Sequence, residues 1–377
     1  MKVFIFHANA GHGHKKVAEV IEQAFRREDP AKFQVSVFDA LDFTPGFFKK
    51  IYPAIYYYAV KYFPGVWGFF YELLDLPLVY HILRPLRSLH NRIMGSKLLA
   101  YIAGEQPDAV ICTHFLSAEL IASAKRRRAA DTMLFTVITD FYPHSFWVNE
   151  GTDRYRVMSE EGAADLRKRG VPDSLIDAGG IPVGSMFCPK NRRREVLTRH
   201  ALNPNTMTIL LTSGSFGLGP QEAVLDALAP FKDNLQCLAV CGNNQPLFER
   251  LKARTFPYPV RVFGFVDFMA DLMDASDLMI AKPGGATTCE SLSIGIPLVT
   301  MEPIPGQESR NARLLKIRRT GYEIHKPEDI GPIIQQIRTD PNELTKKREN
   351  IKQLAKPEAA QALIRMVLEI AADGHQK

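Results

Sequence analysis

The sequence predicts an α/β protein built from two parallel-sheet domains in tandem, and three observations support this fold class. Short apolar runs alternate with helical patterns in both halves of the chain, as expected of parallel strands joined by helices. The length of 377 residues exceeds what one hydrophobic core usually organises, and 46% apolar content is ample for two. Several apolar runs end in glycine-rich or polar turns, where parallel strands usually present functional loops.

In the N-terminal half, short apolar runs predict buried strands and the stretches between them predict helices. The expected strands are residues 3–6, 34–38, 108–113, 133–138 and 155–158. The expected helices are residues 14–27, 116–128 and 160–169. The pattern breaks at residues 179–183, and the charged stretch 189–204 is expected to be an irregular link between domains.

The C-terminal half repeats the alternation. Its expected strands are residues 208–212, 235–240, 260–263, 278–281, 298–301 and 322–324. Helices are expected at residues 221–228 and, closing the chain, at about 357–372. We therefore predict a first domain at residues 1–185, a second at 186–356 and a final helical segment at 357–377.

An aromatic and basic segment interrupts the first domain at about residues 43–97. Residues 43–80 hold 14 of the chain's 37 aromatic residues, including Tyr57, Trp67 and Phe70. Seven Lys or Arg against two carboxylates give residues 43–97 a net charge of +5, nearly all of the formal +6. Aromatic rings beside cations are typical of peripheral contact with an anionic membrane surface, which is our interpretation. The alternative is a helical hairpin buried against the first domain, with solvated cations.

The sequence also argues against three other classes of protein: membrane-spanning, secreted and nucleic-acid-binding proteins. Apolar runs 51–60 and 62–71 are split by Lys61 and fall short of the ~18 residues of a membrane span, so none is expected. Residues 1–6 are too short an apolar run for a secretory signal. Five scattered cysteines indicate reduced thiols in a cytosolic protein. The basic runs 125–128 and 192–194 lack interleaved aromatics, so no nucleic-acid partner is expected.

The most informative motif is the turn Pro283-Gly284-Gly285 together with the polar residues after it. The turn comes directly after a predicted buried strand and opens a helix, whose first backbone N–H groups are unpaired and attract phosphate. Glu290 lies about one and a half turns inside, where a carboxylate can accept from two ribose hydroxyls. Gln307 and Glu308 open a later helix with groups suited to sugar hydroxyls. The series predicts a sugar-nucleotide site; an ordinary capped turn with an exposed Glu is the alternative.

A second glycine-rich turn, residues 213–219, also comes after a predicted strand. Ser213, Gly214 and Ser215 allow backbone amides to approach an anion, although the turn is neither a Walker loop nor a dinucleotide fingerprint. We expect it to form a second wall of the diphosphate site. The chain contains no Asp-x-Asp, so we expect neither a metal nor any cofactor. Helix dipoles, backbone amides and Lys282 or Arg310 would then stabilise the leaving diphosphate.

Three blocks occur in the order of a known family. They are Ala10-Gly11-His12-Gly13-His14, then Thr139-Asp140-Phe141 with His144 and Trp147, then the stretch 282–312. Together they resemble the glycosyltransferases that include bacterial processive diacylglycerol glucosyltransferases and plant monogalactosyldiacylglycerol synthases. The resemblance implies a GT-B fold, in which two Rossmann-like domains face each other across a cleft and the last helix packs back on the first domain.

The resemblance also implies an activity: inverting transfer of a hexose from UDP-glucose or UDP-galactose to diacylglycerol or a glycosylated diacylglycerol. The enzyme would act as a peripheral protein on the cytoplasmic face of the cell membrane. The residues implied near the donor are Pro283, Gly284, Gly285 and Thr287 for the diphosphate, Glu290 for the ribose, Gln307, Glu308 and Asn311 for the hexose, and Phe265 and Val266 for uracil. A packed aromatic turn is the alternative for Phe265 and Val266. Those implied near the acceptor are Gly13, His144 and Trp147.

Inversion requires a base that takes the proton of the acceptor hydroxyl. His14 is our first choice, because its usual pKa is near neutral and a glycine-flanked turn after the first strand carries it. Asp140 is the alternative, either as the base or as the carboxylate that orients a histidine. His14 could instead be a structural hydrogen-bonding residue, or bind an anionic headgroup at the start of its helix. His12 stands where the family usually has a small residue, so the identity of the substrate-facing histidine stays open.

Other functions stay open at this point. The same donor could serve a polyprenyl-linked or other lipid acceptor. A sugar-nucleotide epimerase of the same architecture would not need the aromatic and basic segment. A lipid- or nucleotide-binding regulator without activity would not need Glu290, Gln307 and residues 140–147. Glucose and galactose differ at one hydroxyl that Gln307 and Glu308 suit in either epimer, so the sequence does not separate the two donors.

Overall fold

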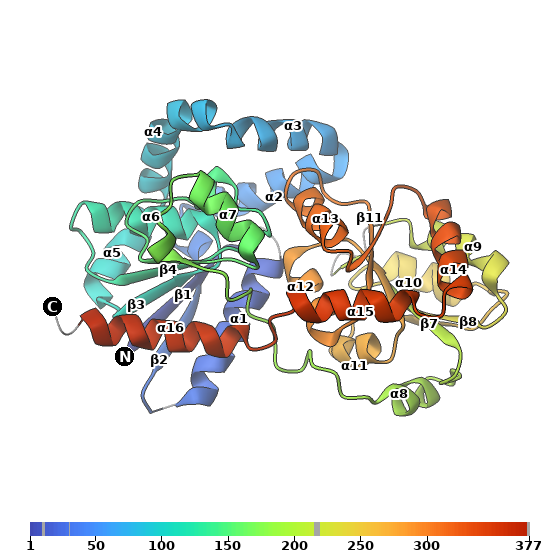
Figure 1. Cartoon of the computed structure of the whole chain (residues 1–377). Helices are drawn as coiled ribbons and strands as arrows, with labels where there is room; N and C mark the ends of the chain where they lie inside the picture. The colour runs from blue at the N-terminus through green and yellow to red at the C-terminus, as the bar shows by residue number, and fades with distance from the viewer. Residues whose placement is uncertain (10–11, 30, 215–218, 375–377) are drawn as a thin grey trace. The chain divides into compact units, whose positions relative to one another are not determined.

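The computed structural model describes residues 1–9, 12–29, 31–214 and 219–374. The chain divides into two compact units. Unit 1 comprises Met1–Gly184, Ile304–Arg310 and Lys356–Lys377, and unit 2 comprises Ser185–Pro303 and Asn311–Ala355. Each unit contains a parallel sheet of six strands with helices on its two faces (Figure 1), so the predicted α/β class is confirmed.

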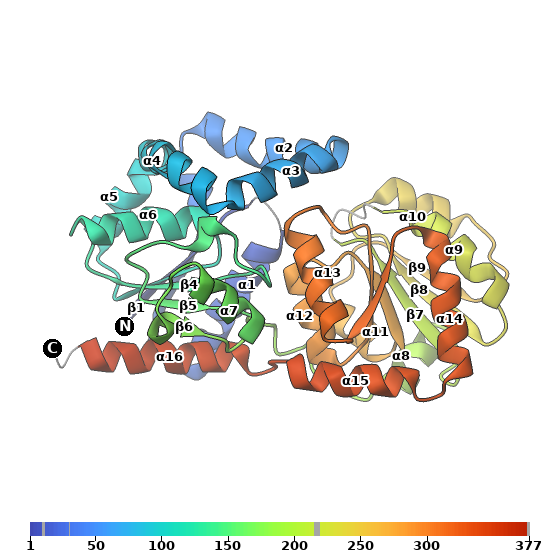
Figure 2. The same cartoon turned by 45° about the horizontal axis from the view of Figure 1, so that its top comes forward.

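The sheet of unit 1 has the strand order β2-β1-β3-β4-β5-β6. Its strands are β1 (Lys2–His7), β2 (Gln34–Asp39), β3 (Ala109–Cys112), β4 (Met133–Val137), β5 (Arg154–Arg156) and β6 (Ile176–Asp177). Figures 1 and 2 show α1 (His12–Glu28) and α16 (Ala359–Gly374) on one face, with α5 (Ser96–Glu105) and α6 (Phe115–Arg126) on the other. The chain reverses direction across the sheet between β1 and β3, the point at which parallel sheets usually bind ligands.

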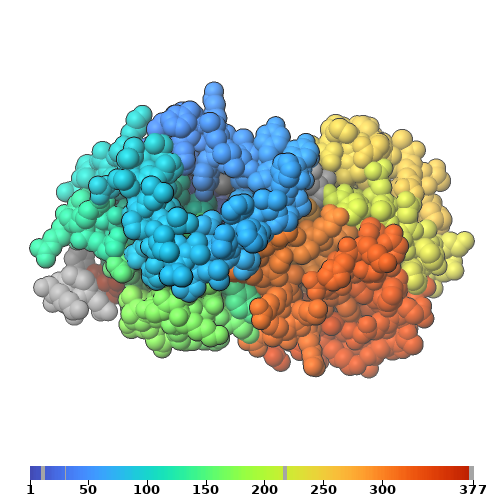
Figure 3. All heavy atoms as spheres, turned by 90° about the horizontal axis from the view of Figure 1, so that it is seen from above, coloured from blue at the N-terminus to red at the C-terminus, as the bar shows by residue number. Residues whose placement is uncertain are grey.

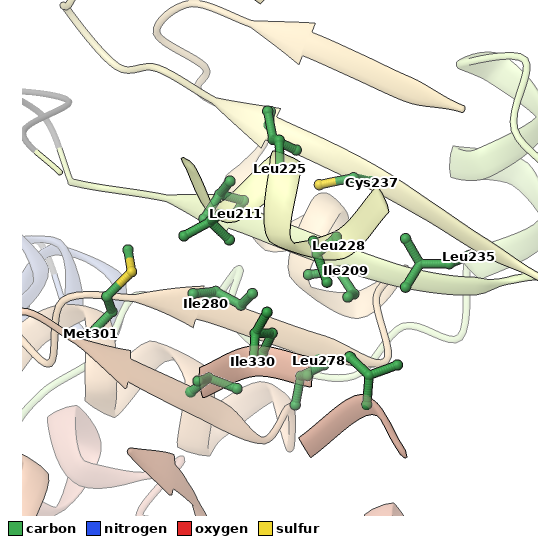
Figure 4. Close-up of a cluster of buried hydrophobic side chains, with 14 of the residues drawn as sticks. Ile209, Leu211, Leu225, Leu228, Leu235, Cys237, Leu278, Ile280, Met301 and Ile330 are labelled. Carbon is green, nitrogen blue, oxygen red and sulfur yellow. The ribbon is translucent and has the colours of Figure 1, made fainter. Parts of the chain in front are cut away.

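The sheet of unit 2 has the order β12-β11-β10-β7-β8-β9. Its strands are β7 (Met207–Thr212), β8 (Leu235–Val240), β9 (Val260–Phe263), β10 (Leu278–Ala281), β11 (Leu298–Met301) and β12 (Gly321–Ile324). Leu225 and Leu228 of α9 (Gln221–Leu228) pack against buried strand residues such as Leu211 and Ile280 (Figure 4). Here the reversal lies between β7 and β10.

The remaining helices of unit 2 surround this sheet. They are α8 (Arg193–Arg199), α10 (Gln245–Lys252), α11 (Met269–Asp274), α12 (Gly285–Ile294), α14 (Ile330–Thr339) and α15 (Glu343–Leu354), with α13 (Gln307–Ile317) beginning in the part assigned to unit 1. Helix α7 (Glu160–Lys168) completes unit 1.

Helix α8 corrects the prediction that residues 189–204 are irregular. Glu195 pairs with Arg192 and Arg199, three and four residues away, which is the spacing that supports a helix. Arg193 donates to the carbonyl oxygens of Pro204 (2.9 Å) and Ala275 (2.6 Å) and so fixes α8 on unit 2. The charges that suggested a solvated link therefore stabilise a short helix.

The aromatic and basic segment forms three consecutive helices before α5: α2 (Gly46–Tyr62), α3 (Pro64–Asp75) and α4 (Pro77–Met94). Pro64 and Pro77 open α3 and α4, where a missing N–H costs no hydrogen bond. Within the described residues no single helix is long and apolar enough to cross a membrane, although α3 and α4 together, bent by 92°, meet that length and composition.

Buried Glu119 of α6 fastens α4 to unit 1. Its carboxylate accepts a hydrogen bond from the Asn91 side chain (2.7 Å) and lies 3.2 Å from the Arg87 guanidinium. Both partners belong to α4, so this one buried carboxylate links α4 to α6, which covers one face of the sheet.

We expect Glu119→Ala to destabilise unit 1 by about 3 kcal/mol, because the partly buried Arg87 charge loses its carboxylate. Urea unfolding followed by tryptophan fluorescence measures this, since Trp67 and Trp147 are the chain's two tryptophans and both belong to unit 1. Glu105→Ala, which removes an exposed pair with Lys2, is the matched control and should cost about 1 kcal/mol or less. Equal losses in the two variants would contradict the role of Glu119.

Candidate functional site

In unit 1, the segments after β1, β3 and β4 come together at one edge of the sheet. The register pairs Phe6 with Cys112 and Cys112 with Thr136, so the three strands end side by side. Thr113 and His114 come after β3, and Thr139 and Asp140 come after β4. The first turn of α1, with Gly13 and His14, lies at the same edge because Thr113 bonds to His14.

The hydrogen bonds of His14 define its tautomer. Its Nδ1 lies 2.9 Å from the Thr113 carbonyl oxygen and 2.9 Å from the Thr139 hydroxyl. A carbonyl oxygen only accepts, so Nδ1 carries the proton and Nε2 is left with its lone pair. The Thr113 hydroxyl also donates to the His14 backbone carbonyl (2.9 Å), so one residue positions both the ring and its backbone. His14 is therefore oriented as an acceptor of protons.

Asp140 lies in the same buried cluster. The indole Nε1 of Trp147 donates to its Oδ2 at 2.8 Å. Burial raises the pKa of Asp140 above its usual value, although the neighbouring His14 and the Trp147 hydrogen bond oppose the shift. Burial lowers the pKa of His14, whereas the Asp140 carboxylate and the Thr113 carbonyl raise it. At neutral pH the imidazole is thus neutral, and the ionised form of Asp140 would stabilise its protonated form.

Trp147 and His144 are buried side chains that pack against this cluster, contrary to the expectation that they lie next to the acceptor. Trp147 has 0% exposure, and its ring packs against those of His14 and Phe115. His144 donates from Nε2 to the Tyr71 carbonyl (2.9 Å), while its Nδ1 accepts the Phe146 N–H (3.1 Å). Burial lowers the pKa of His144 to about 4, so it stays neutral and holds α3 in place.

In unit 2, the segments that follow β7 and β10 begin level with each other at the carboxyl edge of the sheet. Ile280 of β10 pairs with Leu211 of β7, so the turn after Ala281 lies level with the turn after Thr212. Gly214 adopts a positive φ of 71°, which favours glycine. Ser213 is buried and accepts a hydrogen bond from Gln221 (3.2 Å). Ser215 lies outside the described residues.

The Pro283-Gly284-Gly285 turn forms a helix start, as predicted. Gly284 is the N-cap of α12, and the first hydrogen bond of the helix runs from the Thr288 N–H to the Gly284 carbonyl (2.9 Å). The preceding N–H groups, including those of Gly285 and Thr287, have no partner inside the helix. With the helix dipole they form a site suited to an anion.

Asn311 is placed differently from the expectation that it faces a hexose. Its Nδ2 donates to the Pro283 carbonyl oxygen at 2.8 Å, and the side chain is buried. It therefore holds the turn of the anion site in place. Glu308 accepts the Ile304 N–H (2.8 Å) and so orders the loop before α13, whereas Gln307 is the half-buried first residue of that helix.

The other residues of unit 2 that were expected near the donor are Glu290, Phe265 and Val266. Glu290 of α12 is only 5% exposed, which excludes the alternative of an ordinary exposed glutamate. Phe265 and Val266 come after β9, which is separated from β7 by one strand. The Phe265 side chain is 67% exposed, so the alternative of a packed aromatic turn is wrong for this ring.

Exposed large hydrophobic side chains gather on α2, α3 and α4, and together they are called the apolar face. Of 19 exposed large hydrophobic residues among the described ones, 16 lie between Phe47 and Ile93, so the alternative of a buried hairpin is wrong. Figure 3 looks onto these helices, coloured blue to cyan. Trp67 is half-buried, Phe70 is 51% exposed, and Tyr57 accepts from Lys61 (3.2 Å).

The cations of this segment divide into two groups. Five are exposed: Lys49, Lys50 and Lys61 on α2, Arg92 on α4 and Lys97 on α5. Arg84 and Arg87 instead turn toward Glu150 and Glu119. Arg87 is therefore bound to a buried carboxylate of unit 1, whereas Arg84 stays partly exposed at 3.9 Å from Glu150.

Sequence reasoning missed Thr113, His114 and Tyr71. Thr113 and His114 come directly after a predicted strand, so the rule that functional loops lie at strand ends was a signal for them. Tyr71 gave no such signal, because its contacts come from the distant residues 140–147. Across the described residues, no three His, Cys, Asp or Glu side chains are grouped as metal ligands would be.

Two family models match consecutive parts of the chain. Residues 14–183 match monogalactosyldiacylglycerol (MGDG) synthase, and residues 208–366 match the glycosyltransferase family 28 C-terminal domain. A relative from Bacillus thuringiensis (strain Al Hakam), named processive diacylglycerol beta-glucosyltransferase, is 28% identical over 98% of this chain and 93% of its own length.

Solved structures share the fold. MurG of Acinetobacter baumannii superposes with a TM-score of 0.64 at 15% identity, covering 98% of this chain and 99% of its own. HepE of Anabaena, solved in complex with UDP-glucose, gives a TM-score of 0.55 at 14% identity, covering 100% and 99%. At these identities the likeness concerns the arrangement of the chain.

We expect His14 to titrate with a midpoint below about 6.5 and to carry its neutral proton on Nδ1. Asp140→Asn should lower the midpoint further, because the carboxylate that stabilises the imidazolium is lost. Histidine-selective ¹⁵N NMR measures both the tautomer and the pKa. His144 is the internal control, with a pKa of about 4. A proton on Nε2, or a higher midpoint in Asp140→Asn, would contradict this geometry.

Proposed function

We propose, on the premise that the chain belongs to the monogalactosyldiacylglycerol synthase family of GT-B glycosyltransferases, that it transfers a hexose from a UDP-sugar to diacylglycerol or a glycosylated diacylglycerol. The transfer inverts the anomeric carbon and takes place at an anionic membrane surface. The observation that carries the proposal is the contact of His14 Nδ1 with the Thr113 carbonyl oxygen (2.9 Å), in the cluster that Trp147 links to Asp140.

The acceptor half of the reaction uses Nε2 of His14 as the base. It takes the proton of the acceptor hydroxyl as that oxygen attacks the anomeric carbon, and the bond from this carbon to the UDP oxygen breaks with its electron pair leaving on UDP. The Thr113 carbonyl keeps the Nδ1 proton in place throughout. The Asp140 carboxylate stabilises the imidazolium that results, while Trp147 holds Asp140.

The donor half of the proposed reaction would use groups of unit 2. The free N–H groups at the start of α12 and its dipole would stabilise the charge that develops on the leaving diphosphate, with Lys282 adding a cation. Asn311 holds the turn that carries these groups. Ser213, Gly214 and Ser215 would form the second wall, and Glu290 would bind the ribose. We therefore propose that the transfer needs neither a metal ion nor a cofactor.

The apolar face of α2–α4 would supply the membrane contact. Its aromatic and aliphatic side chains are exposed, and so are four cations of the same helices, Lys49, Lys50, Lys61 and Arg92. Apolar burial together with attraction to anionic headgroups is how peripheral helices bind membranes. An epimerase acting on a sugar nucleotide in water has no use for such a face.

UDP-glucose is the first donor to test, since the curated relatives are named glucosyltransferases. UDP-galactose stays the second, because Gln307 and Glu308 suit either hexose.

The experiment supplies purified protein with anionic vesicles containing diacylglycerol and with each UDP-sugar in turn, both with and without EDTA. We expect a β-linked hexosyl lipid, identified by mass and anomeric configuration, and a rate in EDTA within twofold of the rate without it. Vesicles containing a polyprenyl phosphate acceptor test the alternative. Product only from the polyprenyl lipid, or none from either, would overturn the proposed acceptor; loss of the rate in EDTA would overturn metal independence.

We expect Phe69→Ser with Phe70→Ser to weaken binding to anionic vesicles by roughly 100-fold, because each exposed ring contributes about 1.5 kcal/mol when it enters the apolar layer. Co-sedimentation with vesicles measures the partition coefficient. Ile317→Ser removes a side chain that is exposed outside the apolar face and should leave binding unchanged. If the double variant binds as the unmodified chain does, α3 does not enter the membrane.

A further inference from the structure

Helix α3 carries two buried polar atoms that have no hydrogen-bond partner among the described residues. They are Nε1 of Trp67 and Oη of Tyr71. Tyrosine hydroxyls and tryptophan N–H groups normally find a partner when buried, because an unpaired one costs free energy. The two atoms therefore offer hydrogen bonds that the described protein groups do not use.

Both side chains lie on one face of α3. They are four residues apart, which makes them neighbours on a helix, and their ring centroids are 6.4 Å apart. Tyr56 of α2 packs edge-on against Trp67 at 5.3 Å and encloses the pair. Phe69 and Phe70, between them in sequence, are 64% and 51% exposed. One short helix thus has an apolar outer face and an inner face with free donors.

The inner face lies next to the proposed catalytic cluster. Burial raises the pKa of Tyr71 well above its usual value, and the charge of Asp140 adds to the shift. The pKa of Tyr56 is also raised, first by burial and then by Glu308 and Asp140. The Tyr71 hydroxyl therefore stays protonated and able to donate. Its ring lies 4.5 Å from that of His144, four residues after Asp140 in the same loop.

Residues 140–147 hold the end of α3 rigidly. His144 donates to the Tyr71 carbonyl (2.9 Å), and the two rings lie 4.5 Å apart. Asp75, one turn further, accepts from the Ser145 backbone N–H (2.7 Å) and from the Arg169 guanidinium (2.7 Å). A binding group fixed in this way loses little conformational freedom when a ligand arrives.

We propose that Tyr71 and Trp67 bind the polar head of the acceptor lipid, by donating hydrogen bonds to glycerol or sugar oxygens, and so position its free hydroxyl beside Asp140 and His14. The inference rests on the proposed function and names residues that select the acceptor. The acyl chains of the same lipid run along the exposed side of α3, past Phe69 and Phe70, into the membrane.

The test is Tyr71→Phe, which removes the unpaired hydroxyl alone. We expect kcat/KM for dioctanoylglycerol at saturating UDP-sugar to fall roughly tenfold, the effect of one neutral hydrogen bond. The KM for UDP-sugar should stay within twofold, as should binding to vesicles without diacylglycerol. The thermal midpoint without lipid should be unchanged or higher. Trp67→Phe should show the same pattern, and Tyr101→Phe, the same change elsewhere in unit 1, should show none of it.

A binding measurement separates this inference from the proposed function. Vesicles with dioctanoylglycerol should raise the thermal midpoint of the unmodified chain above that with plain vesicles, and Tyr71→Phe should lose most of this difference. If no glycolipid forms, the proposed function fails, yet a lipid-dependent shift that Tyr71→Phe loses still supports the binding role. Three results would overturn the inference. They are a thermal shift that Tyr71→Phe retains, no thermal shift in the unmodified chain, and a loss of kcat/KM in Tyr71→Phe that is equal for the UDP-sugar and for dioctanoylglycerol.

Discussion

The hydrogen bond from Nδ1 of His14 to the Thr113 carbonyl is the interaction on which the proposed chemistry depends. It requires β1, β3 and β4 to lie side by side with their carboxyl ends level, which the parallel register provides. Slipping β3 by one residue would turn alternate side chains to the opposite face of the sheet and displace the carbonyl. The largely buried strands β1, β3 and β4 therefore determine the position of one imidazole, which links the packing of the sheet to the proposed choice of base.

Burial then acts on both members of the His14 and Asp140 pair, with opposite effects on their pKa values. It favours the neutral imidazole and disfavours the carboxylate, while each group partly restores the charged form of the other. The Trp147 indole N–H stabilises Asp140 without adding a charge. A full ion pair in this position would already hold the proton that His14, as the proposed base, would receive. A neutral histidine beside a supported carboxylate would keep that capacity until the acceptor hydroxyl of the proposed reaction gives up its proton.

Strands that are determined by local sequence patterns were predicted correctly. Residues 260–263, 278–281 and 298–301 were predicted as strands with the observed bounds, because short apolar runs end at clear turn residues. The sequence-based predictions failed where the role of a side chain depends on partners that are distant in the sequence. Asn311 serves the Pro283 turn 28 residues away, and Trp147 is buried beneath the site it was expected to line. The charges of residues 192–199 suggested solvent, but their three- and four-residue spacing builds α8. Side-chain roles of this kind depend on tertiary packing, which one sequence does not display.

In the proposed reaction, helix α3 would meet a requirement of any enzyme that acts on a membrane lipid. Its acceptor has apolar chains that stay in the bilayer and a hydroxyl that must leave the headgroup region to reach a base. Trp67 and Tyr71 offer hydrogen bonds on the inner face, while Phe69 and Phe70 are exposed on the outer one. Since His144, Ser145 and Arg169 bind the same helix, its two faces cannot move independently of residues 140–147. A lipid bound along α3 would therefore present its hydroxyl at a fixed height above the membrane, where Asp140 and His14 are held by the same loop and the same sheet.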